Sequence, residues 1–470
     1  MLVPTILRST GRVLLMHWPL LLAWFLGGTL ARYGAIELSG FAGAHWSVGG
    51  LLLLPLAVLA RLISFVGMFL VVRDGLRELQ SIAPLPESGR ERRATFVQSL
   101  LAGILPFFAV YAAWGMLRDD TEAYAMRALD VHTGLGWQAF AEAIENGTSV
   151  PEPAEQWSAL DAGIGPWTLL IIAAAFALRW AWKRWQSGLP RAFALVAVYL
   201  EAVWVFFFVW TVKDITVAVG EWASHRAAVV WFEGLRDAIA ERVAVLGAIW
   251  DGVAWLLGQA GGVLLQPLAW LTVAGVIYGQ AIAVEKLRLA ERYLAENRFG
   301  GRYVAGARAR YAKVPEWTRK RMGDLGKEFT SRFQPVWRSV RLMWRAGPIP
   351  IATYVLLYTV VLALEPLLRT AIIRLVGPHD LYSFWIVADG LLFLLVPLIV
   401  EPVRIAVVAS AYDATLGALR RTEGRAAAAA EADPDADPDA VSGSHAVAEQ
   451  VSRDQDPSVE GSIGKRANDG

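Results

Sequence analysis

The sequence predicts an all-α fold, a polytopic integral membrane helical bundle of about eight transmembrane helices with amphipathic interfacial helices and a disordered C-terminal tail. Of its 470 residues, 56% are hydrophobic and only 19% are charged, whereas soluble domains carry about 45–50% apolar and about 25% charged residues. The 21 Trp residues support the same interpretation, because amphipathic rings gather at the membrane–water interface. Eight apolar stretches come close to the length of about 20 residues that crosses a bilayer.

The predicted spans are residues 13–35, 50–72, 95–117, 164–182, 192–212, 262–284, 349–370 and 386–408. The first follows Arg8 and Arg12, as the hydrophobic part of a signal peptide would. It is too long for such a segment, and no small-residue cleavage site follows it. We therefore interpret it as the first membrane span.

The positions of Lys and Arg predict the orientation, because short cytoplasmic loops are enriched in these residues. With the N-terminus inside, the following basic residues share the inner side with region 285–346: Arg8, Arg12, Arg73, Arg77, Arg90, Arg92, Arg93, Lys183, Arg184 and Arg191. Arg369 and Arg374 are the exceptions. We expect both termini to be cytoplasmic. The Ala, Trp and Arg usage resembles that of high-GC bacteria, which predicts a bacterial cytoplasmic (plasma) membrane.

Charge divides the chain into four regions. Residues 1–284 hold six spans and an acidic outer loop, 118–163, with 9 acidic and 2 basic residues. Residues 285–346, with 16 basic and 6 acidic residues, predict a helical region on the cytoplasmic membrane surface. Residues 347–421 hold two further spans. Residues 422–470, with 11 acidic and 4 basic residues, lack the apolar surface that would offset the entropy of ordering and predict a disordered tail.

The basic region at 285–346 interleaves its cations with aromatic residues, which is typical of a helix on an anionic leaflet. Nucleic acid would need the same cations, but this region is tethered at both ends beside lipid. We therefore expect anionic lipid there and no nucleic-acid partner. A membrane protein partner or a homo-oligomer remains open.

Between spans five and six, residues 226–257 have the 3.6-residue periodicity of an amphipathic helix. Such a helix either lies in the outer interface or covers neighbouring helices, and covering is the favoured interpretation. Gly258–Gly262 is expected to break it, and Pro267 to kink the chain that follows. Whether residues 243–267 re-enter the membrane stays open.

Two charged residues are predicted near the middle of spans, Arg61 in span two and Glu201 in span five. A charge in hydrocarbon costs several kcal/mol and is usually paired or functional. At similar depth they are natural partners across the bundle. The pair is interpreted either as a polar site that binds a charged substrate or relays protons, or as a structural ion pair, which membrane bundles also use.

Further intramembrane charges lie in the last two spans: Glu365, Arg369, Asp389, Glu401 and Arg404. Glu365 with Arg369, and Glu401 with Arg404, are i,i+4 and i,i+3 pairs that can neutralise each other locally. Each Glu is followed by a proline, which favours a kink.

One histidine falls in each predicted outer loop, at His45, His132, His225 and His379. A bundle could gather such residues into a metal or pH-sensing site. Their spacing matches no ligand motif, so four unrelated interfacial residues is the favoured interpretation.

No motif for catalysis is present. The chain lacks cysteine, a phosphate-binding P-loop, a Gly-x-Ser-x-Gly elbow and a His-Glu-x-x-His pair. We expect no enzyme activity, no cofactor, and no catalytic, cofactor-binding or metal residues. Two functions remain: a transporter or lipid-handling permease with a midplane polar site at Arg61 and Glu201, or a non-catalytic subunit or scaffold of a membrane complex.

Overall fold

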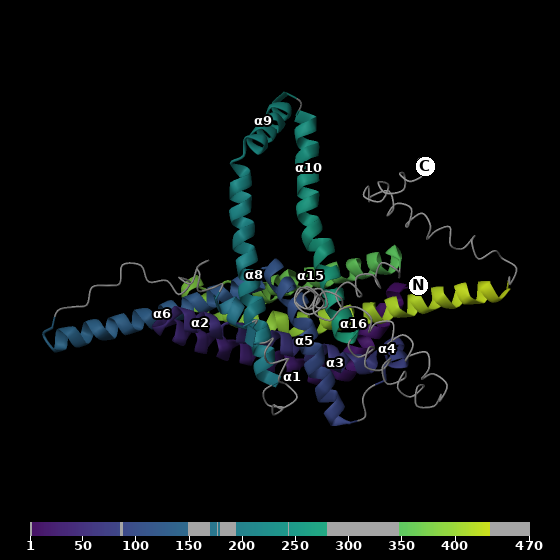
Figure 1. Cartoon of the computed structure of the whole chain (residues 1–470), viewed down its shortest axis with the longest axis horizontal. Helices are drawn as coiled ribbons and strands as arrows, with labels where there is room; N and C mark the ends of the chain where they lie inside the picture. Colours follow the sequence, from purple (N-terminus) through teal and green to yellow (C-terminus); the bar gives the residue numbers. More distant parts are fainter. Residues whose placement is uncertain are drawn as a thin grey trace, which may run out of the picture. The chain divides into compact units, whose positions relative to one another are not determined.

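The structure is a computed structural model, shown in Figure 1. It describes residues 2–84, 88–148, 170–175, 177–178, 194–242, 244–279 and 347–432. The described residues form helices, turns and bends and no strand. The chain forms two compact units, Met1–Leu416 and Gly417–Gly470. In the second, the described residues are the end of the last helix.

Seven helical segments in the described part of the chain are long and apolar enough to cross a membrane. They are Val3–His45, Ser47–Gly75, Gly89–Ala113, Leu195–Ser224, Gly262–Gly279, Pro348–Val376 and Leu381–Arg421. Each corresponds to one of the predicted spans. The remaining predicted span, 164–182, falls largely outside the described residues. The protein is therefore an all-α, multi-pass membrane protein.

The core of the first unit forms around α3 (Pro55–Val72), most of whose residues are buried. Helix α1 (Leu2–His45) packs along α3, and α5 (Gly89–Ala113) packs against both α3 and α8 (Ala194–Ser224). Phe65 of α3 meets Trp270 edge-to-face at 5.1 Å between ring centroids. The short helix α2 (Ser47–Leu53) connects α1 to α3.

The connection from α3 to α5 is compact at its described residues and holds one of the predicted inner cations. It contains η1 (Arg73–Gly75) and α4 (Arg77–Ile82). Arg73 is buried and donates hydrogen bonds to the carbonyls of Ala83 at 2.7 Å and Pro84 at 3.1 Å. Arg12 of α1 donates to the carbonyl of Gly75 at 2.6 Å. The N-terminal part of α1 therefore lies beside the C-terminal end of α3.

The segment predicted as an acidic outer loop, 118–163, forms a helix over much of its length. Helix α6 (Met116–Glu145) packs against α1. The prediction overlooked this helix because its charged residues hid a buried stripe of Leu117, Tyr124 and Ala128. Its exposed acidic residues still fit a segment outside the hydrocarbon. Residues 149–163 lie outside the described residues.

The single amphipathic helix predicted at 226–257 is two helices, α9 (Ala227–Arg242) and α10 (Ala244–Ala260). They pack against each other, and Figure 1 shows α9 following α8 and leading to α10. The prediction of a break at Gly258–Gly262 is also wrong. The chain stays helical there through the π-helical turn η4 (Gly261–Leu265). A wider turn keeps backbone groups bonded next to Pro267, which has no N–H to donate.

The last two spans are α15 (Pro348–Val376) and α16 (Ile386–Ala432), with the π-helical turn η5 (Leu381–Trp385) before α16. Both helices continue through their internal prolines. Helix α16 also extends into the tail predicted to be disordered from residue 422. Its end contains the run Ala426–Ala430, and alanine has the highest helix propensity. Residues 433–470 and the basic region 285–346 lie outside the described residues.

Candidate functional site

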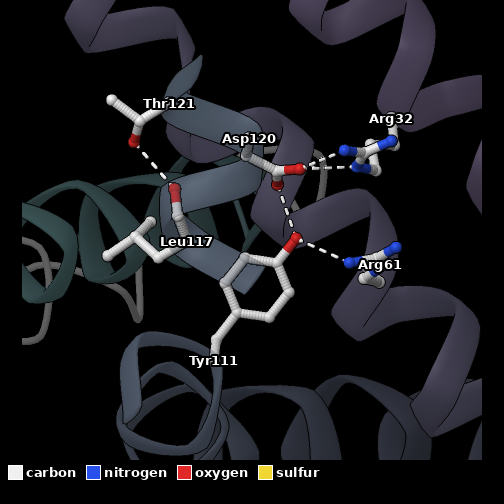
Figure 2. A network of polar contacts seen from close by, with 6 residues as sticks. All are labelled: Arg32, Arg61, Tyr111, Leu117, Asp120 and Thr121. Carbon is white, nitrogen blue, oxygen red and sulfur yellow. Dashed lines mark hydrogen bonds and ion pairs between the residues drawn. The ribbon is translucent and has the colours of Figure 1, made fainter. Parts of the chain in front are cut away.

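The strongest polar cluster inside the bundle has Asp120 at its centre. The Asp120 side chain is fully buried, forms an ion pair with Arg32 of α1, and accepts a hydrogen bond from the Arg32 Nε at 2.6 Å. The hydroxyl of Tyr111, on α5, donates to the other carboxylate oxygen of Asp120 at 2.5 Å. Figure 2 shows Asp120 of α6 between these two side chains.

Arg61 extends this cluster to α3. Its Nη1 donates a hydrogen bond to the Tyr111 hydroxyl at 3.1 Å, and its guanidinium lies 5.6 Å from the centre of the Tyr111 ring. Tyr111 therefore accepts from Arg61 and donates to Asp120 (Figure 2). We call Arg32, Arg61, Tyr111 and Asp120 the polar network. It joins four helices, α1, α3, α5 and α6.

The turn between α5 and α6 makes this geometry possible. Gly115 adopts φ +82, a left-handed conformation that glycine tolerates and other residues rarely adopt. The chain changes direction there, so that Tyr111 at the end of α5 meets Asp120 in the first turns of α6. Thr121 directs its hydroxyl to the carbonyl of Leu117 at 2.7 Å within α6, as Figure 2 shows.

The predicted partnership of Arg61 with Glu201 stays a prediction, and the partner that the structure gives Arg61 is Tyr111. The acidic groups close enough to act on the Arg61 charge are Asp120 and Glu401. Glu201 is buried on α8.

The predicted pair of Glu401 and Arg404 on α16 is confirmed as an ion pair. Both side chains are largely buried, and the Arg404 guanidinium lies 4.5 Å from the centre of the Trp270 ring and 5.9 Å from that of Phe65. Aromatic faces attract cations in this way. The pair is therefore part of the same core as α3 and the sixth predicted span.

The predicted pair of Glu365 and Arg369 is replaced by a pair between helices. Arg369 of α15 binds Asp389 of α16 at 3.2 Å and lies 4.4 Å from the ring centre of Phe393. Glu365 is exposed. Asp389 was identified from the sequence as an intramembrane charge, but a one-helix pattern gives no information on partners across helices. Arg369 and Asp389 are both partly exposed, so this ion pair joins α15 and α16 at the surface of the bundle.

The four loop histidines are not gathered by the structure into a site. His45, His225 and His379 each lie within hydrogen-bond distance of a backbone carbonyl two to four residues earlier. His379 also stacks on Phe384 at 4.2 Å between ring centroids. Across the described ranges, no group of three or more His, Asp or Glu side chains lies close enough to hold a metal ion.

Sequence reasoning missed Arg32, Tyr111 and Asp120 as members of the site. Arg32 lies at the end of a predicted span, where a cation is unremarkable, and Asp120 belongs to a strongly acidic segment. A usable signal was present in α1, where small residues recur around Arg32, including Gly28 and Gly40. Such residues let neighbouring helices approach closely.

The charges of the site do not cancel. Arg32 and Asp120 neutralise each other, and so do Glu401 and Arg404. Arg61 adds a positive charge, and its hydrogen-bond partner Tyr111 is a phenol that is neutral near pH 7. The polar network by itself therefore carries an excess of one positive charge, whereas Glu365 as well as Glu401 acts on the charge of Arg404. Such a site can bind an anion, and the Tyr111 hydroxyl can transmit its arrival to Asp120.

Comparisons with protein families, with curated proteins and with solved structures give no match.

Proposed function

We propose that this multi-pass membrane protein is a transporter or lipid-handling permease whose polar site is the network around Arg61. The position of Arg61 supports this most directly. Its guanidinium stays charged, it lies inside an apolar bundle, and its hydrogen-bond partner is neutral. A charge in this setting costs several kcal/mol, and such residues are usually functional. The excess positive charge favours an anionic substrate or head group.

The network also links anion binding at Arg61 to the packing of the surrounding helices. Tyr111 holds Arg61 on one side and Asp120 on the other. An anion that binds Arg61 competes with Tyr111 for its donors. Release of Tyr111 then weakens the contact of α3 with α5 and α6. Substrate binding at one residue is in this way linked to the packing of several helices.

The proposal is tested by measuring charge movement in proteoliposomes on a solid-supported membrane. A panel of small carboxylates, phosphates and phosphate monoesters is applied to the wild type and to Arg61→Gln. We expect at least one anion to evoke a current in the wild type, and Arg61→Gln to reduce it roughly tenfold or more, as for a lost charge-assisted contact. Arg118→Gln is the matched control, because Arg118 is exposed and pairs with Glu122.

The control variant should keep the wild-type current. Currents that are unchanged in Arg61→Gln, at equal protein content and equal thermal stability, would contradict a role of Arg61 in transport. A wild type that responds to no anion of the panel would also count against the proposal.

The second candidate is a non-catalytic subunit or scaffold, and helices α9 and α10 favour it. They pack against each other and expose large apolar side chains, including Trp231, Phe232, Trp250 and Trp255. Purification in mild detergent followed by mass spectrometry tests this. A stoichiometric protein partner that is lost in Trp231→Ala with Trp255→Ala would support the subunit, whereas recovery without a protein partner would contradict it.

We also propose the bacterial plasma membrane as the location, with both termini cytoplasmic. The distribution of Lys and Arg between alternate loops supports this orientation.

A further inference from the structure

Two cavities adjoin along α1. The larger, of about 850 Å³, is lined by α1, α3, α5 and α8. The smaller, of about 330 Å³, is lined by α1, α5 and the end of α3 with η1. Leu20 and Trp24 line both, so the two cavities are neighbours along the helix.

The larger cavity is an apolar groove. Its α1 wall consists mostly of small residues, among them Ala23, Gly27 and Ala31. The polar side chains that line it already have partners. The Ser64 hydroxyl donates to the carbonyl of Trp24 at 2.7 Å, and the Tyr199 hydroxyl donates to that of Leu52 at 2.8 Å. A ligand of this groove therefore gains from burying hydrocarbon, and polar groups would lose their solvation there.

The smaller cavity is also mostly apolar, but charged side chains line part of it and their balance is positive. Arg73 and Arg92 line it together with one acidic residue, Asp74. His17 also lines it, and within the described residues its Nε2 is buried without a hydrogen-bond partner. A buried polar atom that lacks a partner is costly. An anionic oxygen in the cavity would bind the guanidinium of Arg92, and a turn of the His17 side chain toward the cavity would let the same oxygen satisfy the imidazole.

The cavities lie at depths that fit a lipid. His17 is about 7 Å along α1 from Arg12, and the groove extends from Leu20 to Ala35 over about 22 Å, at ~1.5 Å per residue. Half of the hydrocarbon core is about 15 Å thick. The smaller cavity with its charged residues therefore lies near the membrane surface that carries Arg12, and the groove is long enough for an acyl chain of that leaflet.

We infer that the two cavities form one binding site for an anionic phospholipid. Its phosphate lies against Arg92 and His17 in the field of Arg73, and an acyl chain lies along α1 in the groove. The site uses none of the residues of the polar network, so a test of the lipid site does not depend on the outcome of the test of transport.

Native mass spectrometry of the full chain tests the site. The protein is supplied with equal amounts of dioleoyl phosphatidylglycerol and dioleoyl phosphatidylcholine, which share their chains and differ in charge. We expect the wild type to retain phosphatidylglycerol preferentially, and Arg92→Gln to reduce this preference roughly tenfold. Arg93→Gln is the control, since Arg93 is exposed on the same helix and does not line the cavity.

The groove is tested separately with Gly27→Leu. A Cβ at Gly27 would meet nothing within 4 Å, so the leucine side chain starts in open space and extends into the groove. We expect loss of both lipids, whereas Gly34→Leu, on an exposed part of α1, should retain them. If Gly27→Leu cannot be purified, Ala23→Phe fills the same groove.

Two results would overturn the inference. Equal retention of the two lipids by the wild type would show that the protein does not recognise the negative charge of the head group. Phosphatidylglycerol retention that is unaffected by Arg92→Gln and by filling the groove would place the lipid elsewhere. Glycerophosphoglycerol, the head group without chains, should compete poorly, and full competition would contradict a role for the groove.

Discussion

Asp120 is the residue on which the polar network depends. It is fully buried, and it holds Arg32 of α1 and Tyr111 of α5 at once. Through Tyr111 it also acts on Arg61 of α3. Removing its charge leaves two arginines without a nearby balancing carboxylate on α6.

We therefore expect Asp120→Asn to destabilise the protein by about 3–5 kcal/mol, the usual cost of removing one partner of a buried ion pair. The measurement is thermal unfolding in detergent, followed by intrinsic tryptophan fluorescence. Asp130→Asn is the matched control on the same helix, because Asp130 pairs with Arg127 at an exposed position. The control should change stability by less than about 1 kcal/mol. Equal effects of the two variants would show that the network does not stabilise the bundle.

Asp380 gives a prediction on pH. Its carboxylate accepts hydrogen bonds from the backbone N–H of Ser383 at 2.7 Å and from the Ser383 hydroxyl at 2.9 Å. These bonds favour the charged form and lower the pKa of Asp380 below its ordinary value. The stabilisation is therefore present above the ordinary pKa and is lost as the pH falls through the lowered one.

Hydrogen exchange of the amides in η5 measures this effect. After correction for the intrinsic exchange rate, protection in the wild type should be greater at pH 7 than at pH 3. Asp380→Ala should lack this difference. A pH dependence that persists in Asp380→Ala would assign it to another group.

At the scale of elements, the contact between α1 and α6 positions the network. A Cβ on Gly43 would lie 2.5 Å from the Tyr124 hydroxyl, which also lies close to Gly50. Tyr124 is fully buried, and burial raises its pKa to about 12, so its hydroxyl stays protonated. The absence of side chains at Gly43 of α1 and Gly50 of α2 lets α6 approach both helices closely enough for Asp120 to reach Arg32.

Gly43→Ala should accordingly destabilise the protein by about 1–3 kcal/mol through overpacking. Gly34→Ala, on the same helix with open space around it, should have no such effect. A double-mutant cycle with Tyr124→Leu should show favourable coupling, because the smaller side chain makes room for the new methyl group. Additive effects of Gly43→Ala and Tyr124→Leu would contradict the packing described for these helices.

The elements that could be predicted from the sequence were those with a strong apolar signal. The stretch 50–72 is found as a span because nearly every residue in it is apolar, and Glu401 finds Arg404 because both lie on one helix. Helix α6 was taken for a loop because packing through Tyr124, rather than hydropathy, makes it a helix. The site was predicted only in part. Arg61 was recognised by its charge, but its partners come from α1, α5 and α6, and no pattern within one helix contains that information.

At the scale of the whole molecule, α1 is much longer than a bilayer requires. Its 44 residues extend about 66 Å at ~1.5 Å per residue, against about 30 Å of hydrocarbon. Arg12 and Arg32 lie about 30 Å apart along it. If Arg12 lies at the inner surface, Arg32 and the network lie near the outer edge of the hydrocarbon and α6 continues outside. The orientation therefore decides from which side the proposed substrate would reach Arg61 and which leaflet would supply the proposed lipid.

The absence of cysteine allows a direct measurement of this orientation. Single cysteines at Gln138 of α6 and at Arg90 of α5, both exposed, are treated with a membrane-impermeant maleimide in intact cells and after permeabilisation. We predict that Gln138→Cys is labelled in intact cells and that Arg90→Cys is labelled only after permeabilisation. Labelling of Arg90→Cys but not Gln138→Cys in intact cells would show the opposite orientation and contradict the placement of the network near the outer edge of the hydrocarbon.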